Sequence, residues 1–263
     1  MIKFFRNIRQ SVLMENQTSK YLKYAIGEIV LVVIGILLAL GINSWYNARQ
    51  IKAGNTVYLN KMLNDLDATT KRLDFIIYDK TGELRAAGFC GLQEVVSTCD
   101  SLLKLTYIGL DENNFNYVVS ARIHAGNSLL NVSDYTYTEM LNTGRLYTLQ
   151  SDTLTNAIIQ YYKFCERENL YNISNSDQVD KGYEKFEDGF GKLFMDYQLN
   201  RDGFNLKDYP FYFDKHSKEY NNFQWGLGQM VGGQAANRDK MMEVIKRSED
   251  LKSIIQTYLD YND

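Results

Sequence analysis

The stretch YLKYAIGEIVLVVIGILLALGINSWY, residues 21–46, is the part of the sequence that indicates whether this chain enters a membrane. No polar side chain occurs from Ile29 to Ile42, although hydrophobic residues make up only 45% of the 263 residues. With its apolar flanks, the run reaches the roughly 20 residues that cross the hydrocarbon core of a bilayer as a helix. A buried core helix is the alternative, but no other stretch of the chain resembles this run. We therefore predict one transmembrane helix over residues 25–45.

Charged and aromatic residues around this segment predict its orientation. Cations precede it and aromatic residues follow it: Lys3, Arg6, Arg9, Lys20 and Lys23 come before, Trp45 and Tyr46 after. Cytoplasmic flanks are enriched in cations, and aromatic rings favour the membrane–water interface. We expect a single-pass protein of the bacterial inner (cytoplasmic) membrane, with its N-terminus in the cytoplasm and its C-terminal domain in the periplasm.

A cleaved signal peptide is the alternative to a permanent anchor. Ala39 and Gly41 are small residues near the end of the apolar run, as a cleavage site requires. However, the segment before the run is long for the basic region of a signal peptide, and helical sequence follows the run directly. These features favour an uncleaved signal anchor.

The first residues, MIKFFRNIRQSVL, have an amphipathic pattern of their own. Apolar residues, Phe5 among them, recur at helical spacing, and Lys3, Arg6 and Arg9 occupy the other side. Such a helix would lie on the cytoplasmic leaflet with its cations on anionic headgroups. We predict a cytoplasmic amphipathic basic segment over residues 1–24, with a disordered basic tail as the alternative.

Glu28 is the acidic residue inside the apolar stretch, about one turn from its cytoplasmic end. Its carboxylate can reach the interface and meet a lysine or a headgroup. A second interpretation is that one helix face forms a contact with another membrane helix. This face would consist of Glu28, Leu31, Gly35, Ala39 and Ile42, and its small residues favour close helix packing in lipid. A proton-relay role for Glu28 is a weaker third reading, because the residue lies far from the midplane.

Two stretches carry a resemblance to a known family. MIKFFRNIRQ followed by MENQTSKYLKYAIGEIVLVVIGILLALGINSW resembles the opening of an uncharacterised bacterial family of single-span membrane proteins, a domain of unknown function. YTEMLNTGRLYTLQSDTLTNAIIQYY, residues 137–162, resembles a second recurring segment of that family. The resemblance implies a span near residues 25–45 and a helical domain outside the cytoplasm. It implies nothing about activity, since no catalytic motif accompanies the resemblance.

Residues 46–263 have apolar side chains at helical spacing almost throughout, which predicts an all-α fold, a helical bundle with long helices. FNYVVSARI, residues 115–123, fits a short strand or an irregular turn. Asp152 is expected to be the N-cap of a long helix that the polar run NISNSDQ, residues 172–178, could interrupt. GLGQMVGG, residues 226–233, is expected to be a hinge between the last two helices.

Residues with catalytic or metal-binding potential are sparse. His124 and His216 have no Cys or acidic neighbour at metal-ligand spacing, and the usual nucleotide, hydrolase and metalloprotease motifs are absent from the sequence. The body of the chain is mildly acidic, which offers no nucleic-acid footprint. We expect no catalytic, cofactor or metal site and no enzyme activity.

The three cysteines, Cys90, Cys99 and Cys165, are an odd number for an oxidising compartment. Buried free thiols are the expected state. A bridge from Cys90 to either of the others stays open if Cys90 lies outside the helix that contains Cys99.

These features favour a non-enzymatic, membrane-anchored scaffold or accessory subunit. Its partners would be the lipid bilayer and either further copies of the chain, in a homo-oligomer, or an envelope membrane-protein complex. The alternative is a periplasmic ligand-sensing or binding module, in which aromatic residues within 197–223 line a pocket between helices.

Overall fold

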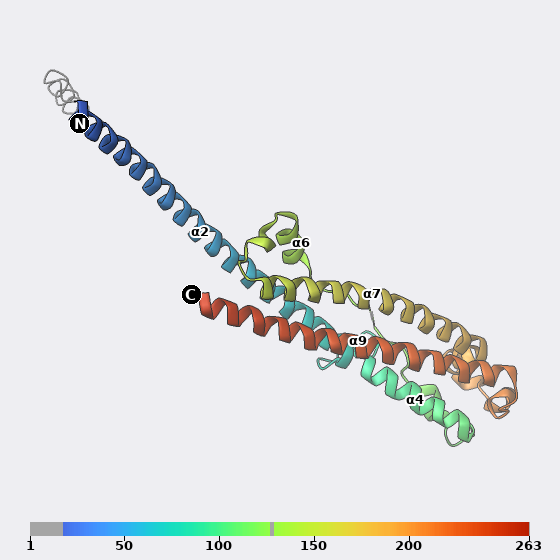
Figure 1. The fold of residues 1–263 in the computed structure, drawn as a ribbon. Helices are drawn as coiled ribbons and strands as arrows, with labels where there is room; N and C mark the ends of the chain where they lie inside the picture. Colours follow the sequence, from blue (N-terminus) through green and yellow to red (C-terminus); the bar gives the residue numbers. More distant parts are fainter. Residues whose placement is uncertain (1–17, 127–128, 263) are drawn as a thin grey trace. The chain divides into compact units, whose positions relative to one another are not determined.

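The computed structural model describes residues 18–126 and 129–262, and this part of the chain is all-α, as predicted (Figure 1). No β-strand occurs within these ranges, and the extended pairing there is an isolated bridge between Cys90 and Ala125. Most of the predicted amphipathic segment, residues 1–24, lies outside the described residues. The chain divides into two compact units, residues 1–57 and 58–263.

The described part of the first unit belongs to helix α2, which runs over Thr18–Tyr78. Proline does not occur in it, so its backbone hydrogen bonds can continue without a break. Every side chain from Ile29 to Ile42 is exposed in the isolated chain. One helix of the described chain is therefore long and apolar enough to cross a membrane, and it includes the predicted span.

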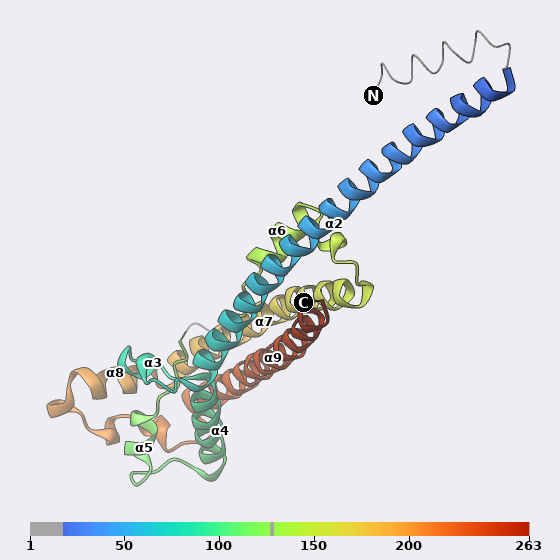
Figure 2. The same cartoon turned by 90° about the vertical axis from the view of Figure 1, so that its left-hand side faces the viewer.

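The second unit is built around the long helices α7 (Asp152–Phe186) and α9 (Lys218–Asn262), which lie side by side in both views (Figures 1 and 2). A π-helical turn, Glu187–Gly191, joins α7 to α8 (Lys192–Leu199). The other helices are α3 (Glu83–Ala86), α4 (Leu92–Ile108), α5 (Phe115–Ser120) and α6 (Tyr135–Asn142), with 3-10 turns at Arg145–Thr148, Arg201–Gly203, Leu206–Asp208 and Pro210–Tyr212.

Two apolar clusters form the core of this unit. The first contains residues of α2, α7 and the second half of α9, such as Leu66, Ile158 and Met241. The second joins α4, α5, the π-helical turn and the start of α9, and it is rich in aromatic rings. Its centre is Phe190, stacked on Phe223 with 4.1 Å between ring centroids. Aromatic residues within 197–223 thus supply much of this second core.

The predicted hinge at GLGQMVGG is wrong, because α9 continues through it. The glycines let two backbones approach instead. A Cβ on Gly226 would lie 2.6 Å from the carbonyl oxygen of Gly182 on α7. A Cβ on Gly233 would lie 2.8 Å from the carbonyl oxygen of Asn175. Real Cβ atoms do not come so close to backbone, so α7 and α9 can pack at this distance only where side chains are missing.

The possible break at residues 172–178 is also absent, because α7 continues through this run as well. Its polar side chains are used inside the domain. Asn175 donates to Asn237 of α9 at 3.0 Å, and Asn237 donates to Ser176 at 3.4 Å. Asn172, which is fully buried, accepts from the backbone nitrogen of Leu130 at 3.0 Å. In the sequence these polar residues suggested a break in the helix. In the structure they form hydrogen bonds with neighbouring segments, including α9.

Two local predictions need correction at residue level. Ser151, not Asp152, is the N-cap of α7, and its hydroxyl accepts from the backbone nitrogen of Leu154 at 3.3 Å. Residues 115–123 form neither a strand nor a mere turn, because Phe115–Ser120 is a short helix and extended chain follows it.

Replacing Gly226 with Ala should lower the free energy of unfolding by about 1–3 kcal/mol, because the added methyl group must push two backbones apart. Gly228→Ala is the matched control, since a Cβ at Gly228 meets nothing within 4 Å. That change should raise stability by about 0.5–1 kcal/mol, as alanine favours the helix. Thermal unfolding of the full chain in detergent, followed by circular dichroism, distinguishes them. Equal effects at both positions would contradict close packing at Gly226.

Candidate functional site

The predicted membrane-helix face lies on the exposed part of α2. Glu28, Leu31, Gly35, Ala39 and Ile42 are all exposed and recur every three or four residues of one continuous helix, so they share a face. A Cβ at Gly35 would meet nothing within 4 Å, which leaves space there for the surface of another helix.

Of the residues predicted to lie at the membrane surface, the structure describes Trp45 and Tyr46. Both are exposed. The guanidinium carbon of Arg49 lies 5.7 Å from the centre of the Trp45 ring, and Gln50 donates to the Tyr46 hydroxyl at 2.8 Å. Polar groups thus follow the aromatic pair, as at the interfacial end of a span. The other predicted residues, Lys3, Phe5, Arg6 and Arg9, lie outside the described residues.

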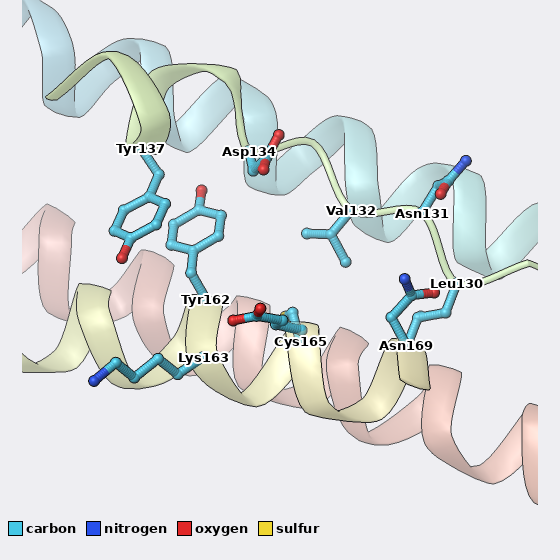
Figure 3. A pocket seen from close by; sticks show the side chains of 10 residues that line it. Leu130, Asn131, Val132, Asp134, Tyr137, Tyr162, Lys163, Cys165 and Asn169 are labelled. Carbon is cyan, nitrogen blue, oxygen red and sulfur yellow. The ribbon is translucent and has the colours of Figure 1, made fainter. Parts of the chain in front are cut away.

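A groove of about 530 Å³ lies between α7 and the segment that leads into α6 (Figure 3). This is the size of a small-molecule site. Its lining combines apolar, aromatic, amide and charged side chains: Leu130, Asn131, Val132, Asp134, Tyr137, Tyr162, Lys163, Cys165, Glu166 and Asn169. None of the aromatic residues within 197–223 is among them.

One wall of the groove is irregular chain, residues 129–134, held by side chains of neighbouring helices. Thr69 of α2 accepts from the backbone nitrogen of Ser133 at 3.0 Å, and Arg72 donates to the carbonyl oxygen of Asn131 at 3.2 Å. Asp65 accepts from the Ser133 hydroxyl and from the backbone nitrogen of Thr136, each at 3.0 Å. Asp65 thereby satisfies a first-turn donor of α6, which the side chain at the N-cap position, Asp134, leaves unbonded.

Tyr162 is the unusual residue of this groove. Its side chain is 6% exposed, and its hydroxyl is buried without a hydrogen-bond partner among the described residues. Its ring stacks on Tyr137 with 4.1 Å between centroids, and Figure 3 shows the two hydroxyls pointing in opposite directions. A buried polar atom without a partner costs about 1–3 kcal/mol. The neighbouring Tyr161 has no such cost, because its hydroxyl lies 2.7 Å from that of Ser248.

Negative charge surrounds the aromatic pair. Burial, and then the charges of Asp65 and Asp134 among others, raise the pKa of Tyr162. Burial is also the main cause of the raised pKa of Tyr137, to which Glu166 contributes. Asp134 and Glu166 are exposed at the groove and form no ion pair with another described residue. Tyr162 is therefore a neutral phenol in a negative field.

A second groove, of about 520 Å³, is lined in part by the π-helical turn and by His124. Turns of this kind are often found at functional sites. His124, however, stacks on Tyr183 with 4.9 Å between ring centroids, and burial lowers the pKa of its imidazole. This histidine is therefore uncharged at neutral pH and serves to pack against Tyr183. Leu199, another residue that lines this groove, is exposed.

The described residues contain no group of three or more His, Cys, Asp or Glu side chains that could hold a metal ion. All three cysteines are free and buried, which confirms the expected thiol state, although Cys90 does lie outside α4. Burial raises the pKa of Cys99 to about 12 and that of Cys165 to about 11, so both are protonated and weak nucleophiles.

Glu168 is a buried charge between α7 and α9. Lys240 and Arg167 each donate to its carboxylate, at 2.5 and 2.7 Å. Burial alone would raise the pKa of Glu168, but these two cations outweigh it and hold the pKa below its ordinary value. Sequence reasoning missed this ion pair and the groove, because their members come from segments that only the fold brings together. Glu168, at a core position of the α7 pattern, was the one signal available.

Comparison with known protein families finds a match. The model of a family described as "Family of unknown function (DUF6090)" matches residues 28–209. No curated protein and no solved structure matches the chain. The matched range includes most of the apolar stretch and all the residues that line the groove.

Tyr161→Phe and Tyr162→Phe should have different effects although the residues are adjacent. The first removes a buried hydrogen bond and should lower the free energy of unfolding by about 1 kcal/mol. The second removes an unpartnered hydroxyl and should leave stability unchanged or slightly higher. Chemical unfolding of the two full-length variants measures both values. A larger loss for Tyr162→Phe would show that its hydroxyl has a partner.

The Glu168 ion pair predicts a pH dependence. Because the pKa of Glu168 is lowered by folding, its carboxylate stabilises the fold above the ordinary glutamate pKa of about 4.3 and loses that effect as the pH falls through this region. The stability difference between wild type and Glu168→Gln should thus shrink from pH 7 to pH 3. Glu184→Gln, at an exposed position of α7, should show no such trend. A constant difference for Glu168→Gln would refute the assignment.

Proposed function

The chain belongs to this family of unknown function, DUF6090, and we propose that it is a non-enzymatic, membrane-anchored scaffold or accessory subunit. The apolar surface of α2 carries the proposal. Exposed fractions there include 65% at Leu31 and 67% at Ile42. Transfer of each such side chain out of water is worth about 1.5–3 kcal/mol, so lipid is the favoured surrounding.

In this proposal the chain is a single-pass protein of a bacterial inner membrane. The basic residues before the span stay in the cytoplasm, and the helical domain lies in the periplasm. The orientation is supported by the cations at Lys3, Arg6 and Arg9 and by the aromatic pair at Trp45 and Tyr46.

The face of α2 that contains Gly35 and Ala39 would bind another membrane helix. Small residues let backbones approach closely in lipid, where dispersion contacts and interhelical hydrogen bonds replace the hydrophobic effect as the driving force. Glu28 on the same face could add one polar contact. The partner would be a second copy of the chain or a helix of an envelope complex.

A ligand-sensing module is the second candidate, and the groove at Tyr162 favours it. The two candidates differ in what accompanies the chain when it is extracted. Purification from native membranes in mild detergent, followed by native mass spectrometry, should yield a homo-oligomer or a stoichiometric protein partner if the scaffold proposal holds. A monomer that carries a bound small molecule would favour the sensing module instead.

The double substitution Gly35→Leu and Ala39→Leu should weaken self-association or docking, because two isobutyl groups separate the helix backbones. We expect at least about a tenfold rise in the concentration at half-association, which sedimentation in detergent measures. Gly41→Leu is the control, since it places one isobutyl group on the same helix about a third of a turn from this face. An unchanged complex in the double variant would contradict a helix contact at this face. Glu28 would then be a residue whose carboxylate only extends to the membrane–water interface.

A further inference from the structure

The groove beside Tyr162 has two features that the membrane anchor does not explain. The first is the unpartnered hydroxyl, which is buried and belongs to a lining residue whose side chain is only 6% exposed. Buried polar atoms in folded proteins almost always have a partner, and exceptions call for an explanation such as a ligand or a bound water. The hydroxyl oxygen can accept a hydrogen bond, and the hydroxyl proton can be donated.

The second feature is the sign of the charge. Asp134 and Glu166 line the groove, and neither forms an ion pair with a described residue. Lys163 is the single cation among the ten lining residues, and Figure 3 shows its side chain extending along α7 away from Tyr162. Asp65 adds negative charge behind the wall segment, where it accepts from Ser133 and Thr136. The field at the hydroxyl therefore favours a positively charged group.

The remaining lining suits the body of a small organic molecule. Leu130 and Val132 offer apolar surface, and Asn131 and Asn169 offer amide groups at the edge. A volume of about 530 Å³ holds a compact molecule with one charged head. The lining is more polar than apolar, so polar groups can orient a ligand while the smaller apolar part contacts its carbon atoms.

We propose that this groove binds a small organic cation, a primary amine or a guanidinium compound. The charged head faces the Asp134 and Glu166 carboxylates and donates an N–H to the Tyr162 oxygen, while the organic part packs on Leu130 and Val132. Binding at this site does not depend on assembly through the span, so a ligand titration and the native mass test the two proposals separately.

The test is a calorimetric titration of the full chain in detergent with tyramine, agmatine and spermidine. At least one of these amines should bind in a saturable manner. For tyramine the uncharged counterpart is tyrosol, which carries a hydroxyl in place of the amine and should bind at least about tenfold more weakly. Failure of all three amines to saturate, or equal binding of tyramine and tyrosol where tyramine binds, would overturn the proposal.

Two variants locate the binding. Tyr162→Phe removes the acceptor, and Asp134→Asn removes one charge at an exposed position; each should weaken the amine that binds by about tenfold or more. Glu184→Gln, elsewhere on α7, should bind as wild type does. Wild-type affinity in Tyr162→Phe would mean that water alone satisfies the hydroxyl, and that result would also overturn the proposal.

Discussion

The constraint on which the whole account depends is the uncovered apolar surface of α2. From Ile29 to Ile42 the helix presents aliphatic side chains on every side, and all of them are exposed. Water is an unfavourable surrounding for such a surface, and the cost grows with each side chain. We propose that lipid or another apolar helix covers it, and the proposals about location and partners follow from that.

This constraint was readable from the sequence because it is local. A continuous apolar run needs no knowledge of the fold, and neither does the helical spacing that predicted the all-α bundle. The same holds for α4, where apolar residues such as Val95, Cys99 and Leu102 recur at helical intervals and are buried as a stripe. The local pattern of apolar residues is enough to predict a helix whose structure does not depend on a distant partner.

Features that need two elements were misread or missed. Glycines 226 and 233 suggest a hinge when α9 is considered alone, but beside α7 they are the positions where a side chain would collide with backbone. The run 172–178 suggests a break until Asn237 is placed opposite Asn175. The groove could not be found at all, because Tyr137 and Tyr162 meet only when α6 packs on α7. In each case the deciding partner is distant in sequence.

Alkaline carbonate extraction of membranes from cells that produce the full chain tests the central claim most directly, since it releases peripheral proteins and leaves spanning ones. The account predicts that the intact polypeptide stays in the membrane pellet and leaves it only with detergent. Recovery of the intact polypeptide in the carbonate supernatant would contradict it, because the surface of α2 would then be covered by something other than lipid.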